Sequence, residues 1–188
     1  RAKFYASQPL MITIKLRKGL RSLRFAAERR VVRKALAASR ERFEMRIIHF
    51  TIQHDHLHLL VEAPRRSAVT KGMQGFLNRI TKRLNELWKR NGSILKERYH
   101  DEVITSPRQT RNAVRYVLHN ARHHGIVLPS AIDPCSSGAA FDGWAVPNYV
   151  PCALPTVVPP SVWLLTTGWK RHGPIGLHEI PKEHRARR

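Results

Sequence analysis

The sequence is short of acidic residues. Only 13 Asp and Glu stand against 34 Lys and Arg in 188 residues, which gives a formal net charge of +21. A neutral partner is therefore not the first expectation, whereas a polyphosphate is, because neutralising phosphates releases counterions and gives strong, salt-dependent binding. The excess is concentrated: residues 1–125 carry 28 basic and 9 acidic residues, and residues 126–188 carry 6 and 4. We expect a nucleic-acid-binding surface in the first two thirds of the chain.

Cysteine and long apolar runs are also scarce. Cys135 and Cys152 are the only cysteines, so no disulfide framework is indicated and a reducing compartment fits. No apolar run reaches the ~18 residues that a membrane span needs, and no secretory signal is recognisable. We predict a cytoplasmic protein that contacts no membrane.

Hydrophobic periodicity predicts a mixed succession of strands and helices. Strands are expected near residues 9–16, 43–50, 54–62 and 99–104. Helices are expected over residues 22–42, 68–90 and 106–124. Ser22 is the predicted N-cap of the first helix, whereas Ser106, Pro107 and Gln109 form a capping box with proline at the first position of the third.

The order of these elements predicts an α+β fold. Strand, helix, strand, strand, helix, strand matches a split βαβ–βαβ arrangement, so we expect a ferredoxin-like antiparallel sheet with an extra helix at its end. Residues 1–125 form the predicted domain. Residues 126–188, rich in Pro, Ser and Gly, are predicted to be an irregular C-terminal tail whose segment 163–169 docks back on the domain.

The predicted strand from His54 to Glu62 carries the first candidate site. Polar and apolar residues alternate in it, and side chains two residues apart on a strand share a face. His54, His56 and His58 would then lie together, each roughly 7 Å from the next, so that two of them could hold one metal ion. A zinc hydrolase using all three remains an alternative, although the outer two would be roughly 13 Å apart.

The third predicted helix supplies a second set of chemical groups. Its polar stripe consists of Tyr116, His119, Asn120 and His123. A phenol with a pKa of about 10 is a weak nucleophile, but it can attack phosphorus when a metal polarises and positions the phosphate. His56 and His58 could hold that metal, and Asn120 could add an oxygen ligand. With phosphate oxygens and water completing the shell, this ligand set suits Mg²⁺ or Mn²⁺.

Three stretches of the sequence resemble the single-tyrosine HUH transposases, especially the REP-associated tyrosine transposases of bacteria. The first is residues 54–62, where His56-Leu57-His58 looks like the histidine–hydrophobic–histidine signature. The others are residues 98–104 and 115–122, and the order and separation of the three also match. The resemblance covers residues 9–125. One departure is Asp55, where relatives often have Asn.

The resemblance implies a reaction and the residues that perform it. Tyr116 falls at the nucleophile, and His56, His58 and Asn120 fall at the ligands of a divalent metal, Mg²⁺ or Mn²⁺. The implied reaction is cleavage of single-stranded DNA, with a 5′-phosphotyrosine intermediate and a free 3′ hydroxyl that allows rejoining. The implied substrate is a palindromic, REP-like DNA hairpin, and the implied process is transposition. The implied location is the bacterial cytoplasm.

Other readings stay open at this point. The chain could be a domesticated protein that binds DNA or RNA hairpins without cutting them, and it could be a monomer or a homodimer. Tyr99 is a rival nucleophile, although packing suits it better. His119 and His123 are expected at the surface or in contact with DNA, and not in catalysis. The predicted phosphate contacts are Arg79, Lys82, Arg83 and Arg115.

Overall fold

A computed structural model describes residues 4–180 of the chain. Its centre is an antiparallel sheet with the strand order β2-β3-β4-β1-β5. The strands are β1 (Leu10–Lys15), β2 (Glu41–Arg42), β3 (Met45–Ile52), β4 (His56–Glu62) and β5 (His100–Val103). The helices are α1 (Ala26–Ala37), α2 (Arg66–Trp88), α3 (Pro107–His123) and α4 (Trp163–Thr166), with 3-10 turns η1 (Gly138–Ala140) and η2 (Gly168–His172). The predicted ferredoxin-like fold is confirmed, with β2 as an added edge strand.

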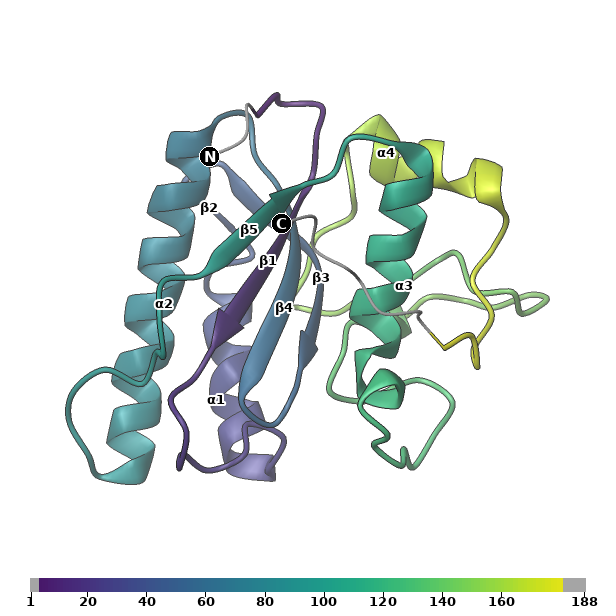
Figure 1. Ribbon diagram of the computed structural model, residues 1–188. Helices are drawn as coiled ribbons and strands as arrows, with labels where there is room; N and C mark the ends of the chain where they lie inside the picture. Colours follow the sequence, from purple (N-terminus) through teal and green to yellow (C-terminus); the bar gives the residue numbers. More distant parts are fainter. Residues whose placement is uncertain (1–3, 181–188) are drawn as a thin grey trace.

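The sheet separates two layers. Helices α1 and α2 cover one face, while α3 and the segment after it cover the other (Figure 1). Leu57, Leu59 and Val61 of β4 face the α1 and α2 layer, as the alternation predicts. Leu60 of β4 and Ile48 of β3 belong to the second core, which they share with α3. The side of β4 that carries His58 therefore faces α3.

Helix starts differ in how well the sequence predicts them. In α3 the Ser106 hydroxyl accepts a hydrogen bond from the Gln109 N–H at 3.3 Å, and Pro107 begins the helix, as expected. The predicted cap Ser22 is wrong, because α1 begins only at Ala26, with Phe25 at the N-cap position. Ser22 instead makes a 2.8 Å hydrogen bond through its hydroxyl to His54 Nδ1.

The strand predicted to begin at Phe43 begins two residues later. Phe43 and Glu44 have φ angles of 55° and 61°, and they connect Arg42 to its cross-strand partner Met45. Positive φ at both central residues is the geometry of a type I′ hairpin turn. Glycine or asparagine usually marks such a turn in a sequence, and neither is present here.

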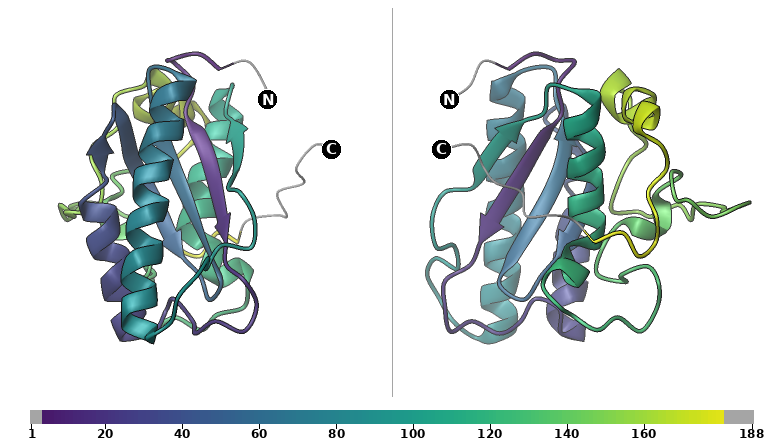
Figure 2. Two further views of the ribbon diagram at one scale, coloured as in Figure 1. Left: turned by 90° about the vertical axis from the view of Figure 1, so that its left-hand side faces the viewer. Right: turned by 45° about the vertical axis from the view of Figure 1, so that its right-hand side comes forward.

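The segment after α3 closes the second core. Phe141, Trp144, Leu165, Trp169 and Ile175 are buried in one cluster with the apolar stripe of α3. Two further views show α4 and η2 beside α3 on the side away from the sheet (Figure 2). Within residues 4–180, no helix combines the length and apolar character needed to cross a membrane. The domain boundary at residue 125 stays a prediction.

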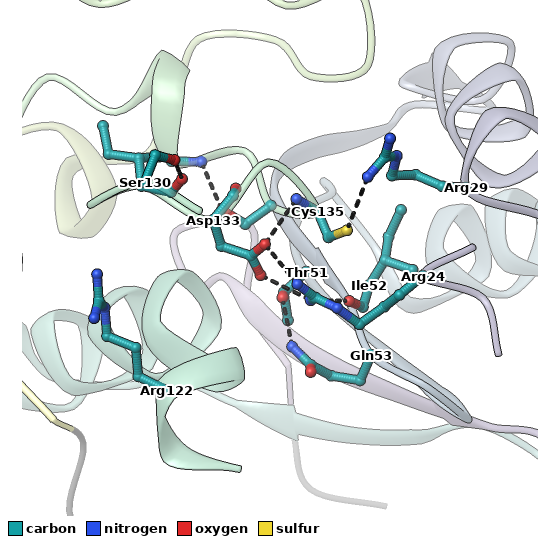
Figure 3. Close-up of polar contacts among 12 residues, drawn as sticks. Arg24, Arg29, Thr51, Ile52, Gln53, Arg122, Ser130, Asp133 and Cys135 are labelled. Carbon is teal, nitrogen blue, oxygen red and sulfur yellow. Dashed lines mark hydrogen bonds and ion pairs between the residues drawn. The ribbon is translucent and has the colours of Figure 1, made fainter. Parts of the chain in front are cut away.

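Buried carboxylates fasten this segment to the sheet. Asp133 accepts two hydrogen bonds of 2.9 Å from the Arg24 guanidinium and one from the Cys135 N–H (Figure 3). Glu62, at the end of β4, accepts hydrogen bonds from Arg46 and from the backbone N–H groups of residues 161 and 162. Both carboxylates are almost fully buried. Charge-assisted bonds of this kind are stronger than neutral ones, so the segment is fixed at both positions.

Candidate active site

Strand β4 brings two of its histidines together. His56 and His58 have ring centroids 4.9 Å apart, and His58 is 5% exposed. His54 is not part of this pair, because it precedes β4 and is bonded to Ser22. No three His, Cys, Asp or Glu side chains in residues 4–180 are grouped so that they could hold a metal. The three-histidine zinc alternative is therefore wrong.

Helix α3 places Tyr116 over the histidines. The Tyr116 ring centroid is 5.1 Å from that of His58. Asn120 follows one helical turn later and is completely buried. Apart from a polar contact with Tyr116, neither its side-chain oxygen nor its side-chain nitrogen has a hydrogen-bond partner within the described residues. The structure thus brings Tyr116 together with His56 and His58, and Asn120 lies one helical turn from Tyr116 and contacts it.

The environment of Tyr116 keeps its phenol protonated. Burial raises the pKa of Tyr116 above its ordinary value, and a weaker polar contact with Asn120 opposes that shift only in part. His123 also lies beside the ring, with centroids 5.7 Å apart. At neutral pH the phenol is neutral, so it must lose its proton in the course of any nucleophilic attack.

A cleft of about 490 Å³ opens beside Tyr116. Its walls include Thr13, Lys15, His58, Arg98, Glu102 and Tyr116. Lys15 and Arg98 are exposed and give this cleft two cations that the sequence reasoning missed. For Lys15 a signal existed: it alternates with Thr13 on β1, and in the antiparallel register these two residues face His56 and His58.

The predicted phosphate contacts do not gather at the cleft. Arg79, Lys82 and Arg83 lie on α2, which covers the opposite face of the sheet, and Arg79 donates to the Ser39 hydroxyl at 2.7 Å. Arg115 precedes Tyr116, but its guanidinium donates to the Glu179 carboxylate at 2.6 Å. Whether these four residues contact DNA stays a prediction.

Glu179 ties α3 to the end of the described chain. Burial acts to raise its pKa, but hydrogen bonds from Arg111 and Arg115 outweigh that effect and lower the pKa to about 2. His119 of the same helix is 3% exposed and is hydrogen-bonded to the Gly176 carbonyl at 2.9 Å. The expectation that His119 lies at the surface is wrong, because this last segment covers it.

Tyr99 is held mainly by packing. It is 8% exposed and belongs to the core on the α1 and α2 side of the sheet, although it also contributes to the wall of the cleft. Tyr116 instead stands with the histidine rings. The geometry therefore favours Tyr116 over Tyr99 as the reactive phenol.

Comparison with known proteins agrees with this architecture. The chain belongs to the IS200-like transposase family, whose sequence model matches residues 5–120. It resembles the structure of a REP-associated tyrosine transposase bound to a REP hairpin, with 17% identity and a TM-score of 0.57 over 68% of this chain and 74% of that one. A suggested transposase from Deinococcus radiodurans shows 10% identity and a TM-score of 0.45, over 56% and 85% of the two chains. No curated protein sequence matches.

Proposed function

We propose that this transposase cuts and rejoins single-stranded DNA through a covalent bond between Tyr116 and a 5′ phosphate. The observation that carries the proposal is the position of Tyr116, whose ring is 5.1 Å from that of His58 at the wall of a cleft that contains Lys15 and Arg98. Hairpin DNA is the proposed substrate, because a protein of similar fold has been solved with a REP hairpin bound.

The ligand set fits a divalent cation. His56 and His58 supply two imidazoles, and Asn120 supplies an amide oxygen. That oxygen is buried and has no hydrogen-bond partner within residues 4–180. A hard divalent ion completes its shell with phosphate oxygens and water, so Mg²⁺ or Mn²⁺ suits the site. When bound, the ion would polarise the scissile phosphate and hold it in line for attack.

The chain's own residues account for the remaining steps. The Tyr116 oxygen bonds to phosphorus as its proton passes to water, and the bond from phosphorus to the 3′ oxygen breaks. The 3′ oxygen takes up a proton from water and becomes a hydroxyl. Because the phosphotyrosine ester keeps the energy of the broken bond, a 3′ hydroxyl can attack it and restore the phosphodiester. Lys15 and Arg98 would hold flanking phosphates in the cleft.

Metal removal tests the proposal directly. With Mn²⁺ or Mg²⁺, the protein is expected to retain a labelled strand from a hairpin oligonucleotide as a covalent band on a denaturing gel. EDTA should reduce that band to background, because the phosphate is then no longer polarised. Binding to several hairpins without any covalent band would contradict cleavage and favour the hairpin-binding alternative.

A charge-reversal pair tests the DNA path. Lys15→Glu with Arg98→Glu is expected to weaken binding of single-stranded DNA about tenfold and to lower the salt dependence by about 0.7 per lost phosphate contact. Lys82→Glu with Arg83→Glu is the matched control, since it changes the net charge equally on the opposite layer. Fluorescence anisotropy across a salt series measures both. An equal or larger loss in the control pair would place the DNA on α2 instead.

A further inference from the structure

We propose that Asp55 and Thr13 are positioning residues that fix the tautomer of the histidine pair. Each makes a hydrogen bond to a ring nitrogen of one histidine, and both bonds involve Nδ1. The Asp55 carboxylate is 2.8 Å from Nδ1 of His56, and the Thr13 hydroxyl is 3.0 Å from Nδ1 of His58. A carboxylate can only accept such a bond, whereas a hydroxyl can accept or donate. We assign the Thr13 hydroxyl the acceptor role, so that in both rings Nε2 would carry the lone pair that a metal needs. The inference rests on the proposed function.

The Asp55 contact defines the proton position on His56. An ionised carboxylate has no proton to donate, and the Asp55 carboxylate oxygen is the atom that faces Nδ1 of His56. Nδ1 of His56 must therefore carry the hydrogen and donate it. In a neutral imidazole the other nitrogen, Nε2, then has the lone pair that a metal needs. A carboxylate behind a ligating histidine is a recurrent arrangement in metalloproteins.

The Thr13 contact is built into the sheet. Thr13 on β1 is the direct cross-strand partner of His58 on β4, and directly opposed residues on one face have close Cβ atoms. Thr51 on β3 is the partner of His58 on its other side. The Thr51 hydroxyl accepts a hydrogen bond from the Gln53 side chain at 2.9 Å. The two threonines therefore form a natural matched pair.

The two positions should differ in strength. Asp55 is 71% exposed, so water competes for its bond to His56, whereas Thr13 and His58 meet in a partly buried setting. Losing a residue that orients a metal ligand typically costs about 10- to 100-fold in metal affinity. We expect Asp55→Ala near the lower end of that range and Thr13→Val near the upper end.

Two readouts separate this inference from the proposed function. Long-range ¹H–¹⁵N spectra of the metal-free protein report which ring nitrogen of each histidine carries the hydrogen. Mn²⁺ titration followed by electron paramagnetic resonance reports affinity. The wild type should show Nδ1–H on both histidines. Asp55→Ala should shift His56 toward the Nε2–H form, and Thr13→Val should do the same for His58.

Conservative variants supply the controls. Asp55→Asn keeps an acceptor oxygen and Thr13→Ser keeps the hydroxyl, so both should retain the wild-type tautomers and Mn²⁺ affinity within about threefold, well short of the losses of the non-conservative variants. Thr51→Val should leave the His58 tautomer unchanged. Nε2–H forms in the wild type, or unchanged tautomers in Asp55→Ala and Thr13→Val, would overturn the inference. Absence of Mn²⁺ binding by a wild type with Nδ1–H rings would instead count against the proposed function alone.

Discussion

Tyr116→Phe is expected to abolish the covalent protein–DNA band while leaving hairpin binding within about twofold of the wild type. The substitution removes only the phenolic oxygen, which is the atom that would bond to phosphorus. The ring remains to pack beside His58, so the cleft keeps its shape. Loss of a nucleophile lowers the rate by several orders of magnitude, which takes the band below detection on a denaturing gel.

Tyr99→Phe is the matched control for that experiment. Tyr99 contributes to the wall of the same cleft, but its ring belongs to the core on the other side of the sheet. The control variant should still form the adduct with Mn²⁺. If Tyr116→Phe formed the adduct and Tyr99→Phe did not, the nucleophile would be Tyr99 and our assignment would be wrong.

Arg24→Ala is expected to lower the free energy of unfolding by about 3 to 5 kcal/mol, the usual cost of leaving one partner of a buried ion pair without the other. Asp133 is about 1% exposed and accepts two bonds from Arg24, so its charge would lose its main compensation. The same guanidinium also donates to the Ile52 carbonyl at 2.9 Å. Urea denaturation followed by circular dichroism measures the change.

Arg30→Ala controls for the removal of an arginine near the same end of the molecule. Arg30 is exposed on α1, and its loss should change the free energy of unfolding by no more than about 0.5 kcal/mol. A loss below about 1 kcal/mol for Arg24→Ala would mean that the Asp133 contact does not hold the segment in solution.

The fold was largely predictable because its signals are local. Alternation around Leu57 and Leu59 indicates the strand and its buried face, and Ser106 with Gln109 marks the start of α3. The turn at Phe43 and Glu44 could not be foreseen, since neither residue type signals positive φ. Ser22 is a good cap by type, yet its hydroxyl is used by His54, which lies 32 residues away in the chain.

The site was predictable only in part. Periodicity indicates that Tyr116 and Asn120 share one side of a helix, but the contact of Tyr116 with His58 follows from the family resemblance and not from spacing. The ion pair between Arg115 and Glu179 joins residues 64 positions apart, and no periodic pattern predicts such a contact. An arginine beside the proposed nucleophile is expected to contact phosphate until its distant carboxylate partner is known.

The late position of the second core in the chain has a consequence for synthesis on the ribosome. The layer of α1 and α2 can pack on the sheet once β5 has been made, with Cys135 and the partly buried Val157 as its later contributors within residues 4–180. The apolar stripe of α3 needs Trp169 and Ile175 to be covered. Nascent chains therefore expose the side of that stripe turned away from the sheet while about fifty further residues are translated. During this interval a chaperone has a specific surface to recognise, and the domain stays immature until the segment with Trp169 and Ile175 emerges.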